Sequence, residues 1–476
     1  MAEFLVMDSQ GWPYGLNLSK NEEAIADTEL VQAENCEYSE DDGALRTVPG
    51  VTIKMTASAD ITSLFYNRVY KLFYYTVGTN IYETKDFLTS TLLGTITGAS
   101  KPVYCMYSDV CLIASGAQLQ AISAGTTLQT VSASPDRCDY VTVRTGRVLA
   151  YATNSDELLY SAIGDYTSWA NVAADSSSAQ KIKVGYKDPG NIIAVDFLSK
   201  AVMVYKDGGR AYKIVGEPQD SDYSVQPVSQ TAYCSSIRST VSVDSKSYYL
   251  GKSGFMSFQP TNAYGDVAPF EEGVNLNPRI VGNIDDTCEL WHVSPKKQIW
   301  LKAQGDKRVY MYHYVPRYSD GRGAFTVRTM AYNLHDVCCV GDTVYVAYGN
   351  KIGLLDDSTD LDDTIQIQTA ITSRNKLASK HSILVMNRLF VSSNLIDGYG
   401  TIKCGKKTKA LTFSIKSGYA YDATEYAYDA DYYAYLDEYT RSYKVGGGSN
   451  KSVQVQIIVQ KGAVSIRSFN YQYLEV

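Results

Sequence analysis

The feature of this sequence that most restricts its fold is a strand pattern that recurs every 38 to 51 residues. Each unit holds short runs in which apolar and polar residues alternate, as in Val141, Val143 and Val148, and turn residues separate the runs. Alternation with a period of two is the signature of β-strands. Seven such units begin near residues 61, 101, 139, 190, 236, 286 and 333.

A repeat of this length holds about four strands, which is the size of one blade of a β-propeller. A single four-stranded sheet has two apolar faces and cannot cover both by itself. Sheets packed radially around an axis bury both faces, and a closed ring leaves no exposed end sheet. The sequence therefore predicts an all-β chain with a six- or seven-bladed β-propeller over residues 61–356. The alternative interpretation is a pair of stacked sandwiches built from irregularly spaced hairpins.

The regions on either side of the repeats differ from them in composition. Residues 1–60 carry 12 acidic and three basic side chains, so this segment has a net charge of -9 and predicts an acidic N-terminal arm that leads into the first blade. The Asp-rich residues 357–363 predict an inter-domain linker, because their spacing does not fit a calcium-binding loop. A metal site is the alternative there. Longer alternating strands predict a β-sandwich over residues 364–476.

Residues 417–440 form the most unusual segment of the chain. Eight of its 24 residues are tyrosine, six are acidic, and none is lysine or arginine. Exposed aromatic side chains at this density favour a surface that contacts a partner, and a low-complexity loop without a role is the alternative. The candidate interface residues are Tyr419, Tyr421, Tyr426, Tyr428, Tyr432, Tyr433, Tyr435 and Tyr439.

The tightest basic group consists of Lys403, Lys406, Lys407 and Lys409. We interpret it as the tip of a hairpin, because lysines on an edge strand oppose aggregation. A DNA-binding patch is the alternative, but no aromatic residue alternates with the lysines as in single-strand binding surfaces.

The residues that usually carry catalysis are scarce. Histidine occurs 4 times and tyrosine 40 times, which favours sheets and interfaces over acid–base chemistry. No nucleophile elbow, phosphate-binding loop or zinc-protease motif is present. The nine cysteines lack paired spacing and are interpreted as small buried residues. The sequence therefore predicts no enzyme, no cofactor, and no catalytic, cofactor-binding or metal-ligating residue. No apolar run is long enough for a membrane-spanning helix.

Three segments carry a resemblance to a known family. Residues 15–51 run through an acidic stretch into Leu45-Arg46, two further residues and Pro49-Gly50. Residues 146–169 and 248–261 each place a strand pair around a turn. Together these segments resemble the tail hub, or packaged-DNA stabilisation, proteins of short-tailed bacteriophages and the related tail nozzle proteins. The tyrosine-rich segment does not belong to the family pattern.

The resemblance implies a structural virion protein, a tail hub or nozzle ring that joins the portal–adaptor complex to the distal tail and helps to retain packaged DNA. It implies a propeller followed by a β-sandwich or jelly-roll-like domain. The implied partners are further copies of the chain in a homohexameric ring, the head-to-tail adaptor or connector, and distal needle, fibre or spike proteins. DNA would pass without sequence-specific binding during genome ejection, and the protein would assemble in the host bacterial cytoplasm before it resides in the virion tail.

Two other functions remain open from the sequence. A glycan-binding or receptor-binding propeller of a phage tail would need repeated Asp-boxes, or arginine and carboxylate side chains that converge on the axis, and the sequence displays neither pattern. A bacterial scaffold propeller for protein–protein contacts is the other alternative.

Overall fold

The computed structural model describes most of the chain. The described residues are 5–7, 12–39, 43–99, 101–172, 175–198, 201–220, 223–261, 266–305, 307–378, 384–393, 397–404, 407–414, 439–444, 449–450, 452–461 and 465–475. They form two compact units. The propeller unit comprises Ile53–Lys307 and Tyr332–Leu354, and the terminal unit comprises Met1–Thr52, Arg308–Ala331 and Leu355–Val476.

The propeller unit contains five complete four-stranded antiparallel sheets, each made of four consecutive strands. The first is β6 (Ile61–Asn67), β7 (Leu72–Val77), β8 (Asn80–Thr84) and β9 (Thr91–Thr95), and the second is β10 (Val103–Tyr107), β11 (Val110–Ala114), β12 (Gln120–Ser123) and β13 (Thr127–Thr130). The third is β14 (Tyr140–Arg144), β15 (Arg147–Tyr151), β16 (Glu157–Tyr160) and β17 (Gln180–Lys183). The fourth is β18 (Ile192–Leu198), β19 (Ala201–Lys206), β20 (Ala211–Val215) and β21 (Ser224–Ser229), and the fifth is β22 (Thr240–Val243), β23 (Lys246–Gly251), β24 (Gly254–Pro260) and β25 (Val267–Phe270).

Two further groups of strands continue the series in the propeller unit. One is the hairpin of β26 (Glu289–Val293) and β27 (Gln298–Lys302), and the other is β30 (Leu334–Val340), β31 (Thr343–Tyr348) and β32 (Lys351–Asp356). The short helix α1 (Asn277–Ile280) and the 3-10 turns η1 (Val281–Asn283) and η2 (Ser294–Lys296) lie between strands. Each of the seven strand groups therefore begins within four residues of a start predicted from the sequence.

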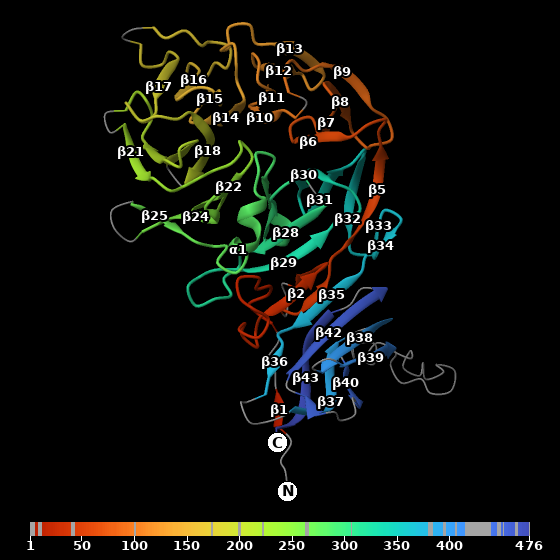
Figure 1. Cartoon of the computed structure of the whole chain (residues 1–476). Coiled ribbons are helices and arrows are strands. Elements are labelled where there is room, and N and C mark those ends of the chain that lie inside the picture. Colours follow the sequence, from red (N-terminus) through yellow and green to blue (C-terminus); the bar gives the residue numbers. More distant parts are fainter. Residues whose placement is uncertain are drawn as a thin grey trace, which may run out of the picture. The chain divides into compact units, whose positions relative to one another are not determined.

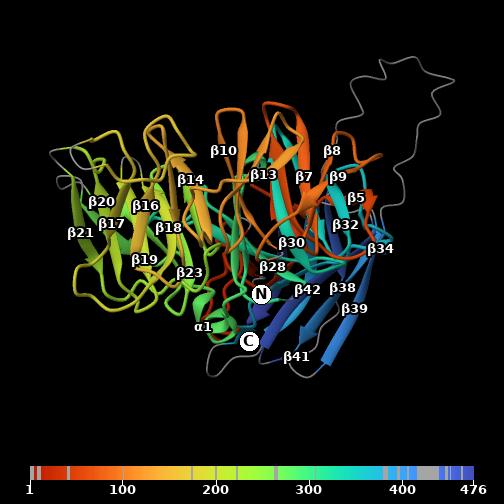
Figure 2. The ribbon, with the colours of Figure 1, turned by 90° about the horizontal axis from the view of Figure 1, so that it is seen from above.

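The sheets of the propeller unit follow one another around a centre (Figure 1). Contacts between the first strands of the groups join β10 to β14, β18 to β22, β22 to β26 and β26 to β30. The ring closes where β30 contacts β6. The turned view in Figure 2 shows the strands of these sheets standing side by side. An all-β chain built on propeller blades is thus confirmed, with seven innermost strands.

Apolar side chains fill the space between neighbouring sheets. Four clusters of buried residues join the first sheet to the second, the second to the third, the third to the fourth and the fourth to the fifth. A fifth cluster places Ile61, Leu64 and Phe73 of the first sheet against Ala347 and Ile352 of the last strands. This arrangement is the physical reason for the repeat, because each sheet buries both faces only when two neighbours cover it.

The terminal unit combines strands from three stretches of the chain. Its N-terminal strands are β1 (Leu5–Met7), β2 (Leu30–Glu34), β3 (Cys36–Tyr38) and β4 (Leu45–Thr47), and β5 (Gly50–Thr56) leads out of it. Its middle strands are β28 (Arg308–His313) and β29 (Ala324–Thr329). Its later strands are β33 (Leu361–Asp362), β34 (Ile365–Gln366), β35 (Thr369–Ser373), β36 (Lys376–Leu377), β37 (Leu384–Ser393), β38 (Asp397–Cys404), β39 (Lys407–Ser414), β40 (Tyr439–Lys444), β41 (Ser449–Asn450), β42 (Ser452–Lys461) and β43 (Ser465–Glu475).

These strands form two groups of neighbours in the terminal unit. In one, β4 pairs with β43, and β43 pairs with β37, which pairs with β40. In the other, β28 and β29 pair, β29 and β2 pair in parallel, and β2 continues through β35 and β42 to β38 and β39. The β-sandwich over 364–476 stays a prediction, because the exposure of most side chains in β37 to β43 is outside what the structure describes.

The structure departs from the sequence-based division at two places. Residues 12–52 belong to the terminal unit, where β2 and β4 pair with β35 and β43, instead of forming a separate arm. The predicted linker at 357–363 contains β33, and its Asp362 is buried and accepts a hydrogen bond from the Ala331 amide at 2.7 Å. Aspartate count alone predicts solvent exposure, but tertiary hydrogen bonding buries this one.

Candidate functional site

Charged side chains gather where the innermost strands of the propeller unit begin. Asp60 precedes β6, Lys101 precedes β10, Asp139 precedes β14, Arg238 precedes β22, Glu289 opens β26, and His335 is the second residue of β30. We call these six residues the axial ring. Six of the seven strand groups contribute a residue at nearly the same position, and the fourth group, which begins with β18, contributes none. Closure of the propeller therefore brings together side chains that are far apart in the sequence.

Lys101 is the centre of this ring. Its Nζ donates to both carboxylate oxygens of Glu289, at 2.5 and 2.6 Å, and to the backbone carbonyl of His335. The backbone carbonyl of Lys101 accepts a hydrogen bond from Arg238 Nη2 at 2.6 Å. The same ammonium lies 5.7 Å from the centre of the Trp291 ring. One lysine therefore ties together residues from the second, fifth, sixth and seventh strand groups.

A partly buried carboxylate continues this network among the innermost strands. Asp336 accepts hydrogen bonds from Trp291 Nε1 at 3.1 Å and from the backbone amide of Leu64 at 2.9 Å. Burial raises the pKa of Asp336 above its ordinary value. Because Leu64, Trp291 and Asp336 belong to β6, β26 and β30, this carboxylate links the first, sixth and seventh groups.

His335 is electrically neutral near pH 7. Its Nε2 lies 3.5 Å from Asp60 Oδ2, but burial lowers the pKa of His335, and the nearby cations Lys302 and Lys101 lower it further. The count of histidines in the sequence did not reveal the place of His335 in the axial ring. The other two described histidines, His292 and His313, also have pKa values lowered mainly by burial, that of His313 to about 3.

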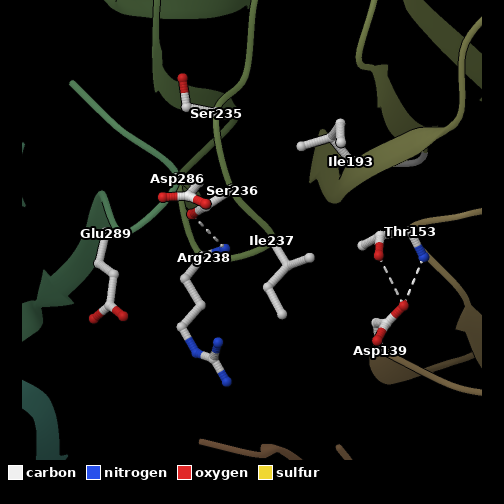
Figure 3. A pocket seen from close by; sticks show the side chains of 9 residues that line it. All are labelled: Asp139, Thr153, Ile193, Ser235, Ser236, Ile237, Arg238, Asp286 and Glu289. Atoms are coloured by element: carbon white, nitrogen blue, oxygen red, sulfur yellow. Dashed lines mark hydrogen bonds between the residues drawn. The ribbon is translucent and has the colours of Figure 1, made fainter. Parts of the chain in front are cut away.

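A cavity of about 350 Å³ adjoins the axial ring. Figure 3 shows it from close by. The wall combines three carboxylates, one guanidinium, hydroxyl groups and two isoleucines, and consists of Asp139, Thr153, Ile193, Ser235, Ser236, Ile237, Arg238, Asp286 and Glu289. Its volume falls within the range of roughly 300–1,000 Å³ that is usual for ligand sites.

The hydroxyl and thiol groups beside the cavity make structural contacts. Ser236 Oγ donates to the carbonyl of Cys288 at 2.6 Å and accepts from the Arg238 amide at 3.2 Å. Burial raises the pKa of the Cys288 thiol to about 12, so this sulfur is protonated at neutral pH. This geometry holds the loop before β22 in place and does not activate a nucleophile.

Three of the four lysines predicted as a hairpin tip lie on a pair of antiparallel strands. The register places Lys403 of β38 opposite Thr408, and Lys409 of β39 opposite Ile402, while Lys407 pairs with Cys404. β39 is the last strand in its sheet order, as expected for an edge. Lys406 lies outside the described residues. The role of these lysines stays a prediction.

Most of the predicted tyrosine interface cannot be placed. Tyr419, Tyr421, Tyr426, Tyr428, Tyr432, Tyr433 and Tyr435 lie outside the described residues. Tyr439 opens β40 and pairs with Ser393 of β37 through the backbone.

Two of the segments that carry the family resemblance have clear structural roles. In residues 146–169, Arg147 is fully buried and donates to the carbonyls of Ser161 and Ser178 at 2.6 and 2.7 Å. In residues 248–261, Gly251 abuts the Tyr233 carbonyl so closely that a Cβ would overlap it. Both segments therefore stabilise individual blades. Residues 146–169 also supply Thr153 to the cavity wall, and residues 248–261 supply no group to it.

Comparisons with known proteins add little about function. No family model and no curated protein sequence matches this chain. Among solved structures, the WD40 β-propeller domain of Doa1 is 11% identical, with a TM-score of 0.41, over 64% of this chain and 96% of that one. PorZ of the type-IX secretion system of Porphyromonas gingivalis is 10% identical, with a TM-score of 0.43, over 76% of this chain and 46% of that one. A chain of the mitotic checkpoint complex is 8% identical, with a TM-score of 0.43, over 65% and 93%.

These structures assign no ligand-binding group and no activity to this chain, because their sequence identities and TM-scores are too low. Among the residues that the structure describes, no three or more histidine, cysteine or acidic side chains gather as metal ligands. Within the same residues, no helix has the length and hydropathy that a membrane span requires.

Proposed function

We propose that this protein is a non-catalytic scaffold whose propeller contacts other proteins. The observation that carries the proposal is the axial ring, where charges are used to join blades. Lys101 neutralises Glu289, and Asp139 is held by Arg137 at 3.0 Å and by the Thr153 hydroxyl at 2.9 Å. Such paired and hydrogen-bonded charges rigidify a fold, whereas a catalytic site keeps at least one reactive group available.

We further propose that the scaffold works in a virion, as a tail hub that joins the portal–adaptor complex to the distal tail and helps to retain DNA. The support is the resemblance of residues 15–51, 146–169 and 248–261 to that family. These segments also make buried contacts that stabilise the fold. Leu45 is buried, Pro49 accepts a hydrogen bond through its carbonyl from Arg328 Nη2 at 3.0 Å, and Gly50 packs against Leu361. A rigid, self-associating part suits such a particle.

The mass and shape of the purified full chain test this proposal. We expect light scattering and cryo-electron microscopy to find a closed ring of copies, with six as the number that the family resemblance implies. Retention of the protein on particles beside a portal–adaptor complex would support the finer proposal. A monomer under all conditions, with a small molecule in the axial cavity, would contradict it.

The tyrosine-rich segment offers a sharper test of self-association. If this segment forms the interface, replacement of Tyr419, Tyr421, Tyr426 and Tyr428 by serine should lower the fraction of assembled rings. Each replacement removes the large apolar contact area of a tyrosine ring. The matched control replaces Asp422 and Asp429 by asparagine, which keeps all tyrosines. Unchanged assembly of the tyrosine variant would exclude these residues from the ring interface.

One observation favours a second candidate, a glycan-binding or receptor-binding propeller. The structure does bring an arginine and carboxylates together, because Arg238, Asp139 and Glu289 line the same cavity. The sequence did not display this convergence, since the three residues are separated by whole blades. Binding of the full chain to a glycan array would distinguish this candidate, and loss of that binding in Arg238→Gln would place the glycan in the cavity.

A further inference from the structure

The charged side chains on the wall of the axial cavity differ in how many hydrogen bonds and ion pairs they make with the rest of the protein. Glu289 receives Lys101 Nζ on both oxygens. Asp139 Oδ2 accepts from Thr153 through the backbone amide at 2.7 Å and through the hydroxyl at 2.9 Å, and both Asp139 oxygens accept from Arg137. These two carboxylates therefore have little capacity left for a ligand.

Arg238 is in the opposite situation. Its guanidinium makes one hydrogen bond, from Nη2 to the carbonyl of Lys101, and no ion pair within the described residues. A guanidinium carries five N–H donors in a planar fork that matches a carboxylate. Most donors of Arg238 are thus unused, although the side chain is only partly exposed.

The direction of the side chains places this unused cation at the cavity. In Figure 3 the guanidinium of Arg238 extends between Glu289 and Asp139, and Asp286, from the segment before β26, points in a different direction. Ile193 and Ile237 supply an apolar part of the wall. A group that fits here has a negative end for Arg238 and a short aliphatic stem for the isoleucines.

We propose that the axial cavity is a socket for an acidic side chain of a protein partner, with Arg238 as its anchor. This inference rests on the proposed function, because a scaffold contacts proteins. Arg238 would bind the carboxylate through two parallel hydrogen bonds, which is the strong geometry for this pair. The flanking carboxylates of Asp139 and Glu289 disfavour a doubly charged phosphate, since like charges at short range repel.

Calorimetric titration of the full chain tests the socket. The probe is a blocked hexapeptide of alternating aspartate and glutamate, and the comparison ligands are a blocked alanine hexapeptide, inorganic phosphate and glucuronate. We expect the acidic peptide to bind, the alanine peptide not to bind, and added salt to weaken binding. Arg238→Gln should lower the affinity by about ten- to a hundredfold, which is the usual cost of losing a hydrogen-bonded charge.

The matched control is Arg279→Gln, which removes an exposed arginine of α1 outside the cavity wall and should leave the affinity unchanged. Arg238→Lys should recover part of the affinity, because it keeps the charge without the planar fork. Thermal unfolding of each variant identifies any loss that is due to misfolding.

Three results would overturn the inference. These are equal peptide affinity in Arg238→Gln and wild type, tighter binding of phosphate or glucuronate than of the peptide, and no binding by the wild type. Ring assembly, measured on the same samples by light scattering, reports on the proposed function separately. A ring that does not bind the peptide refutes only the socket, and a monomer that binds it refutes only the assembly.

Discussion

The propeller unit and the terminal unit are built from strands in opposite ways. Every complete sheet of the propeller unit consists of four consecutive strands, so its hydrogen bonds join neighbours in the sequence. The terminal unit joins residues that are far apart, as where Asn35 Nδ2 donates to the carbonyl of Gln368, 333 positions away, at 2.9 Å. Local pairing needs only short loop closures, whereas distant pairing must fix long loops first.

This difference changes what a short motif means. In the propeller unit, Gly251 pairs with Gly254 of its own blade and packs against the backbone of Tyr233, which lies shortly before that blade in the sequence. In the terminal unit, the segment from Leu45 to Gly50 contacts the middle and the end of the chain, through Arg328, Leu361 and Ile466. A change in this motif therefore disturbs contacts with three distant segments at once.

The largest expected effect lies at the seam that closes the propeller. Phe73→Ala should lower the free energy of unfolding by about 3–5 kcal/mol, as for other large buried side chains. Phe73 packs against Phe87 and Tyr345, with ring centres 4.6 and 4.9 Å away. Urea unfolding measures the change. Leu88→Ala, on an exposed leucine in the connection between β8 and β9, is the control and should change little. Equal effects would mean that this seam does not close the ring.

A second prediction concerns the pH dependence of the propeller unit. Burial raises the pKa of Asp196 to about 6, and Ser247 Oγ donates to it at 2.6 Å. A raised pKa means that the folded state binds a proton more tightly, so this group's contribution to stability is largest below about pH 4. It declines as the pH rises to about 6 and is constant above. The contribution lost amounts to about 3 kcal/mol.

Asp196→Asn removes this titration and should gain about 3 kcal/mol relative to wild type between pH 4 and pH 7. Urea unfolding at pH 4, 5, 6 and 7 measures the difference. Glu157→Gln, on β16 of the neighbouring sheet, is the control for general charge effects. A difference between Asp196→Asn and wild type that does not vary with pH would contradict the assignment.

A third prediction tests the terminal unit. Gly50→Ala should cost about 1–3 kcal/mol, because the added Cβ would overlap the backbone carbonyls of Leu361 and Thr359. Hydrogen exchange measured peptide by peptide should show faster exchange in the terminal unit and no change in β10 to β25. Gly208→Ala is the matched control, since its Cβ would meet open space. Faster exchange spread over both units would show that they do not respond separately.

The smallest expected effect concerns the edge strand β39. Replacement of Lys407 and Lys409 by threonine should change the free energy of unfolding by less than about 0.5 kcal/mol, which is the usual size for the solvent-facing lysines that the sequence predicts here. The variant should nevertheless aggregate faster on storage, because lysines on an edge strand oppose pairing with other chains. Turbidity at high protein concentration measures this, with Lys20→Thr as the control. Unchanged turbidity would contradict the prediction that these lysines protect the edge strand from aggregation.

The blades were predictable because their signal is local. Alternation within Val141 to Ala152 and the turns between the runs are visible in a window of a few residues, and their recurrence indicates the ring. The missed strands are of a different kind. β2 and β4 are short and lie in a segment whose acidic residues suggested a solvated arm, and only their pairing with β35 and β43 makes them strands.

The axial ring could have been found by aligning the starts of the blades. Asp60, Lys101, Asp139 and Glu289 each lie within two residues of the first strand of a unit, and a charged residue recurring there is a detectable signal. What such an alignment does not give is which charges pair. Lys101 of the second strand group binds Glu289 of the sixth, and Arg238 uses only one of its donors, because side-chain reach and burial decide these contacts.

The order of residues by itself determined the all-β class, the length of the repeating sheet and the positions where blades begin, because a strand's alternation and its turn residues act over a few neighbours. The tertiary structure alone decided that the first 52 residues join the end of the chain and that Lys101, Glu289, Arg238 and His335 come into contact from four strand groups. Those outcomes depend on which distant surfaces bury each other, and burial is a property of the whole packed chain.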